Sequence, residues 1–142
     1  MWRDERQLKV NELAVACQAS VDAYEQAAQL VESPTLAEWL RAVARHRERL
    51  VPLFEEQVRE LDDLPRVPDP EMQLVEQALT RFKAALPMGG HHRVLDERIQ
   101  ADQDMLALAK SARKEALPHA ARRLLDNFVT HLEITLGTLA KF

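Results

Sequence analysis

Residues that build strands and tight turns are scarce in this chain of 142 residues, which has three glycines, one tyrosine and two isoleucines. Sandwich and barrel folds need β-branched and aromatic residues separated by glycine-rich turns. The single cysteine, Cys17, has no partner for an intrachain disulfide. Apolar runs are only a few residues long, whereas a bilayer-spanning helix needs about 20. These absences exclude a strand-rich fold, a disulfide framework and a membrane-spanning protein.

Charge of one sign does not dominate either, since 19 basic and 23 acidic side chains give a formal net charge of -4. The two signs are interspersed, so no basic field for nucleic acid is visible. The first residues, Met1 to Arg6, lack the apolar core of a secretory signal. We therefore expect a cytoplasmic protein that binds neither nucleic acid nor membranes.

What is abundant is alanine, leucine, glutamate, arginine and glutamine, the residues that lose least on becoming helical. A first helix is expected from about residue 7 to residue 32. Its apolar positions advance by threes and fours along one stripe: Val10, Leu13, Cys17, Val21, Tyr24, Ala28 and Val31. Ser33 as N-cap and Pro34 at the first helical position then predict the start of a second helix.

The second helix has an inner line with two alternative choices along it: Leu36, Trp39 or Leu40, Val43, His46, Leu50, Leu53 or Phe54, Val58 and Leu61. Pro52 lies inside this helix and predicts a kink just after His46. Arginines alternate around the helix and are expected to form a solvated, salt-bridged face: Arg41, Arg45, Arg47 and Arg49.

Three prolines between Leu64 and Pro70 predict the main connector. A shorter helix should run from Asp69–Pro70 to Leu86, before Pro87 and a glycine pair. A further helix is expected from about residue 92 to 114, and a last one begins at Pro118. Their inner lines are Leu95, Ile99, Asp102, Leu106 and Ala109, and then Ala121, Leu125, Phe128, Leu132, Thr135 and Leu139. The pattern predicts one all-α domain over residues 1–142, a four-helix bundle with an elaborated crossover.

Several local pieces resemble a known bacterial group. They are Cys17, Tyr24, Ala27-Ala28, the run Arg81–Leu86 with Gly89-Gly90, and Leu95-x-Glu97. From about residue 8 to 136 the chain is similar to the ferritin-like family catalogued as domain of unknown function 2383. That resemblance implies a ferritin-like up-down four-helix bundle with an extra shorter helix in the crossover, and no established activity. The acidic run of that family reads Ile99–Gln103 here, where Asp102 keeps a carboxylate.

Di-iron bundles take a Glu-x-x-His motif from each of two helices, because residues three apart share one inward face. This chain contains no such motif. His46-x-Glu48 and His131-x-Glu133 have suitable residue types, but positions two apart point about 200 degrees around a helix. The standard di-iron ligand set is therefore absent.

A reduced metal site for iron, manganese or zinc remains an alternative, with Glu25, His46, Asp102 and His131 as its ligands. Each has a simpler interpretation. Tyr24 beside them is expected to be a core aromatic whose hydroxyl reaches a partner. His46 would be a hydrogen-bonded core histidine, His131 half exposed, and Asp102 paired with His46 or a nearby arginine.

The leading hypothesis is a non-enzymatic interaction or assembly module that requires no cofactor and forms a homodimer or binds another protein. Four apolar residues off the core line are candidates for that contact: Ala14, Val15, Leu30 and Val129. The competing hypothesis is a metal-dependent redox or storage protein. A third is a small-molecule cavity beside Pro52.

Overall fold

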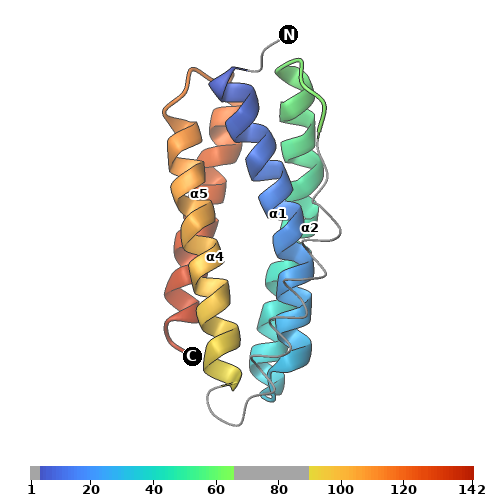
Figure 1. The fold of residues 1–142 in the computed structure, drawn as a ribbon, viewed down its shortest axis with the longest axis vertical. Coiled ribbons are helices and arrows are strands. Elements are labelled where there is room, and N and C mark those ends of the chain that lie inside the picture. The colour runs from blue at the N-terminus through green and yellow to red at the C-terminus, as the bar shows by residue number, and fades with distance from the viewer. Residues whose placement is uncertain (1–3, 66–89) are drawn as a thin grey trace.

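In a computed structural model of the protein, the structure describes residues 4–65 and 90–142 (Figure 1). They form four helices: α1 (Glu5–Leu30), α2 (Pro34–Glu60), α4 (Gly90–Arg113) and α5 (His119–Leu139). This part of the chain contains no strand. The shorter helix expected up to Leu86 lies outside the described residues.

The four helices pack as a bundle in which α1 contacts α2 and α4, while α5 contacts α4 and α2. Figure 1 shows α1 and α5 running in one direction along the long axis, and α2 and α4 running in the other. Neighbouring helices are therefore antiparallel. The all-α four-helix architecture expected from the periodicity is confirmed. None of the described helices is both long and apolar enough to cross a membrane.

Local hydrogen bonds explain where the helices begin and end. Asp4 caps α1 in a capping box, with its Oδ1 accepting from the Gln7 backbone N–H at 2.9 Å and its own N–H donating to Gln7 Oε1 at 2.9 Å. At α2 the predicted cap is confirmed, since Ser33 Oγ accepts from the Leu36 N–H and Pro34 is the first helical residue. Helix α1 begins at Glu5, two residues earlier than expected, because this capping box precedes the apolar stripe.

The end of α2 is held by a left-handed turn. Asp62 has a φ of 60°, and the backbone N–H groups of Asp62 and Asp63 donate to the carbonyls of Arg59 and Val58. This is the double hydrogen bond of a Schellman motif, in which Asp62 replaces the usual glycine. Asn11 of α1 is fully buried and donates to Asp63 Oδ2 at 3.0 Å. This hydrogen bond connects α1 to the turn that ends α2.

The core consists of two apolar clusters, one toward each end of the bundle. The first gathers residues from all four helices, among them Leu13, Phe54, Met105 and Phe128. The second is built mainly on α1 and α2, with Val94, Leu95 and Leu139 from the other helices. Between the two clusters in sequence, each helix contributes a buried polar residue: Ser20, Arg47, Asp102 and Thr135. The core is thus divided by a polar layer.

The inner stripes predicted for α1 and α5 are confirmed, because all of their members are buried. On α2 the structure selects Leu40 and Phe54 over Trp39 and Leu53, and Leu53 is 46% exposed. Helix α2 continues through Pro52 to Glu60. The kink expected near His46 stays a prediction.

Two predictions about buried and exposed residues are wrong. Arg47 is not part of a solvated face but is fully buried, because Arg45 and Arg49 are two residues away from it and therefore lie about 200 degrees around the helix, on the exposed side. Ala14 and Val129 are also buried, in the same apolar cluster, so they cannot form an intermolecular contact. Val15 and Leu30 are partly exposed.

Candidate functional site

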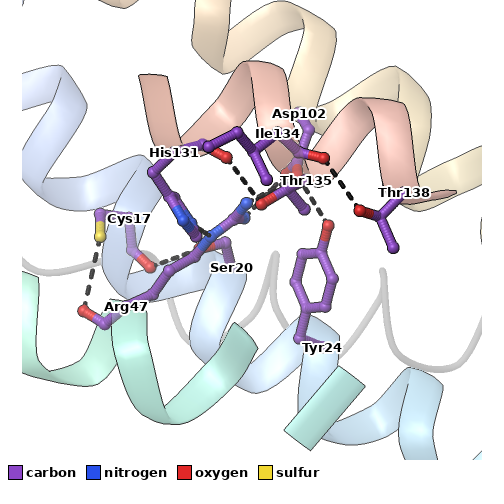
Figure 2. Close-up of polar contacts among 9 residues, drawn as sticks. All are labelled: Cys17, Ser20, Tyr24, Arg47, Asp102, His131, Ile134, Thr135 and Thr138. Carbon is purple, nitrogen blue, oxygen red and sulfur yellow. Dashed lines mark hydrogen bonds and ion pairs between the residues drawn. The ribbon is translucent and has the colours of Figure 1, made fainter. Parts of the chain in front are cut away.

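The polar centre of the bundle takes one side chain from each described helix: Tyr24 of α1, Arg47 of α2, Asp102 of α4 and His131 of α5 (Figure 2). Tyr24, Arg47 and Asp102 are fully buried, and His131 is partly buried. The helical periodicity that lines up the apolar stripes brings these four positions to one level. We call these four residues the polar centre.

Arg47 and Asp102 form a two-point ion pair. Arg47 Nη1 donates to Oδ1 of the carboxylate at 2.8 Å, and Nη2 donates to Oδ2 at 2.6 Å. Tyr24 donates its hydroxyl to the same Oδ2 at 2.6 Å, so the carboxylate accepts from two helices at once. The guanidinium carbon also lies 4.6 Å from the centre of the Tyr24 ring, a cation–π contact. Fork geometry of this kind makes the strongest side-chain hydrogen bonds in proteins.

His131 completes the centre as a neutral acceptor. Its Nε2 accepts from Arg47 Nε at 3.1 Å, which places the imidazole proton on Nδ1. Burial, and then the positive charge of Arg47, lowers the pKa of His131 from 6.5 to about 4. The His46 ring lies 4.5 Å from the His131 ring, and burial with the charges of Arg49 and Arg47 lowers the pKa of His46 as well. Both histidines are therefore uncharged at neutral pH.

Arg47, Tyr24 and Cys17 are held in their ordinary protonation states. Burial favours loss of charge on Arg47, but the hydrogen bonds and charge of Asp102 outweigh it and raise the arginine pKa. Burial raises the pKa of Tyr24, and it raises that of Cys17 to about 12. The Cys17 Sγ lies 3.6 Å from the Arg47 carbonyl oxygen. The centre thus offers neither a thiolate nor a phenolate as a nucleophile.

Hydrogen bonding around the polar centre is complete. Among the described residues, every buried side-chain nitrogen or oxygen has a partner. Figure 2 shows the flanking contacts: Ser20 Oγ donates to the Cys17 carbonyl at 2.7 Å, and Thr135 Oγ1 donates to the His131 carbonyl at 2.8 Å. No orphaned polar atom there points to a missing ligand.

The structure does not bring the four residues considered as metal ligands together around one point. Glu25 is exposed, whereas Asp102 and His131 meet only through Arg47, and His46 contacts the ring of His131. Within residues 4–65 and 90–142 no group of three or more histidine, cysteine or acidic side chains could hold a metal ion. The expected partner for the Tyr24 hydroxyl is confirmed, and of the two partners considered for Asp102 the structure selects an arginine.

Arg47 is the residue that the sequence reasoning missed, although a signal for it exists. It lies seven residues after Leu40 and seven before Phe54, so two helical turns connect it to each of these buried residues. Choosing Leu40 and Phe54 in the inner line of α2 would have placed Arg47 inside. The line drawn through His46 was displaced by one residue.

No protein-family model matches this chain, and no match was found among curated proteins or solved structures. The resemblance to the ferritin-like family is accordingly not confirmed by comparison. The polar centre and the outer faces of the helices are what bear on function.

Proposed function

We propose that this protein is a non-enzymatic helical bundle that acts as an interaction or assembly module, with itself or with another protein as partner. The polar centre is then a structural device that fixes how the four helices fit together. The observation that carries this proposal is Arg47, whose guanidinium fills the middle of the bundle and engages both oxygens of Asp102.

A permanent cation at this point works against metal binding in two ways. It repels a second cation at close range, and it occupies Asp102, the one carboxylate that is buried among the described residues. His131 would also have to give up its hydrogen bond from Arg47 before its Nε2 could bind a metal. The ion pair therefore stands where a ferritin-like metal site would need acidic ligands.

We expect the buried ion pair of this bundle to contribute more to the specificity of helix packing than to net stability, because desolvation offsets much of the attraction between the charges. Sliding one helix by a single turn displaces its side chains by about 5.4 Å, while the contacts of Asp102 are 2.6 to 2.8 Å long. Only one alignment of α2 and α4 satisfies them. A module that presents a defined surface to a partner needs such a fixed alignment.

The alternative is a metal-binding redox or storage protein with a reduced site. It is favoured by one observation, the close approach of the His46 and His131 rings at 4.5 Å. Iron, manganese or zinc bound there would use the two imidazoles, with Asp102 or Glu25 reaching them only after rearrangement. Ferritin-like membership and a cytoplasmic location are likewise parts of the proposal that rest on the sequence.

Elemental analysis of the purified full chain distinguishes the two functions. We expect no stoichiometric iron, manganese or zinc, and no rise in melting temperature when each metal is added. The same titration on H46Q and H131Q, with H119Q as a control at an exposed histidine, identifies the binding groups. Stoichiometric metal whose stabilising effect is lost in H46Q and H131Q but kept in H119Q would establish the alternative and overturn the proposal.

A further inference from the structure

The outer face of α2 carries charges in an unusual order. Arg45 and Arg49 are exposed near the middle of the helix, and Glu56 and Glu60 are exposed toward its C-terminal end. At 3.6 residues per turn these four side chains fall within about 60 degrees around the helix. The face points away from the core, which α2 meets through residues such as Leu40 and Phe54.

This order is unfavourable for an isolated helix. Arg45 and Arg49 are four residues apart, as are Glu56 and Glu60, and like charges at that spacing repel one another. None of the four forms an ion pair with another described residue of the chain. Like charges four residues apart thus occur twice on one exposed face, which indicates that the face serves something other than the stability of its own helix.

We propose that this face binds a second copy of the chain, with the two α2 helices packed antiparallel about a two-fold axis between Pro52 and Leu53. In that arrangement Arg49 faces the partner's Glu56, and Arg45 faces the partner's Glu60. Both pairs have their midpoint between residues 52 and 53, so one axis satisfies them together. The proposal rests on the proposed function and specifies its partner.

Symmetry doubles every contact, because an interface about a two-fold axis uses the same patch on both copies. At the axis lies Leu53, one of the large apolar side chains that the described surface leaves exposed. The face thus has an apolar centre between complementary charged flanks, as protein interfaces do.

The expected affinity is modest. The charged segment from Arg45 to Glu60 is about 24 Å long, and a single pair of helices buries less than the roughly 1,600 Å² of a standard interface. Exposed ion pairs are also screened by salt. We therefore expect a dissociable dimer that weakens as the ionic strength rises.

The test reverses the charges one half at a time and measures mass by sedimentation equilibrium over a range of concentrations. R45E/R49E makes the whole face acidic, and E56R/E60R makes it basic. Each variant alone should bind itself at least about tenfold more weakly than the wild type, because every cross pair becomes repulsive. An equimolar mixture should form a heterodimer, since every cross pair is then attractive. R45E/R49E/E56R/E60R should again form a homodimer.

K110E/R123E is the matched control, because Lys110 and Arg123 are exposed cations on other helices and the net charge changes as in R45E/R49E. It should bind itself as the wild type does. If the variants of α2 keep wild-type association, the chain assembles through another surface: this interface is refuted and the proposed function stands. A wild type that stays monomeric at high concentration, or a mixture that does not associate, refutes the interface as well, while the metal analysis judges the proposed function separately.

Discussion

Removing one charge of the buried pair should be far more damaging than removing the whole pair. In R47M the carboxylate of Asp102 keeps only the hydrogen bond from the Tyr24 hydroxyl, and in D102L the guanidinium of Arg47 keeps only its hydrogen bond to His131 and the contact with the Tyr24 ring. Breaking a buried pair from one side costs about 3–5 kcal/mol. For a chain of this size that corresponds to a fall in melting temperature of roughly 10–17 °C.

The structure also determines how the loss can be recovered. In R47M/D102L no charge remains in the polar centre, but the Tyr24 hydroxyl loses its acceptor at a cost of about 1–3 kcal/mol. Adding Y24F removes that unpaired group. We expect Y24F/R47M/D102L to be at least about 2 kcal/mol more stable than either charge-removing single variant and close to wild type.

Urea denaturation at pH 7, followed by far-UV circular dichroism, measures these free energies of unfolding. Single variants that lose less than about 1 kcal/mol would show that the pair is not buried as described. A triple variant as unstable as the sum of its single substitutions would show that the three groups do not act together.

Three further predictions follow from other residues. The pKa of His131 is about 4 in the folded chain and 6.5 in the unfolded chain, so the unfolded state gains the proton first as pH falls. The free energy of unfolding should therefore drop by about 1–2 kcal/mol between pH 6.5 and 4, after allowing for the partial exposure of His131. H131Q should remove this part of the pH dependence in urea titrations. Cys17, buried and with its pKa raised to about 12, should react with a maleimide only when urea unfolds the chain; reaction at full rate in native buffer would contradict its burial. L53C should give a cross-linked dimer with a short bismaleimide, whereas R123C, at a position that is also exposed, should not. Equal cross-linking of both would indicate random collision.

The helices were predictable because local signals were strong and mutually consistent. The stripe from Val10 to Val31 places every member in the core, and Ser33-Pro34 marks the start of α2 through a cap that depends only on neighbouring residues. Asp102 on an inner line likewise required a buried partner. These inferences depend on periodicity and on the cost of burying charge, both of which can be evaluated from sequence alone.

The composition of the polar centre was not predictable to the same degree. Tyr24, Arg47, Asp102 and His131 are far apart in sequence, and their meeting depends on the relative height of four helices. On α2, two candidate inner stripes lie one residue apart, one through His46 and one through Arg47, and the sequence makes them equally apolar. Only packing against the other helices decides between them, because position 47 faces Asp102 whereas position 46 faces the ring of His131.

The two charges of the polar centre belong to different halves of the molecule. The antiparallel pair α1 and α2 contains Arg47, and the antiparallel pair α4 and α5 contains Asp102. Neither pair alone can bury its charge with a partner, so water must stay between the pairs until both charges meet. Closing the bundle and neutralising its interior are therefore one event. Folding of this chain should be cooperative across all four helices, with neither helical pair persisting as a compact intermediate.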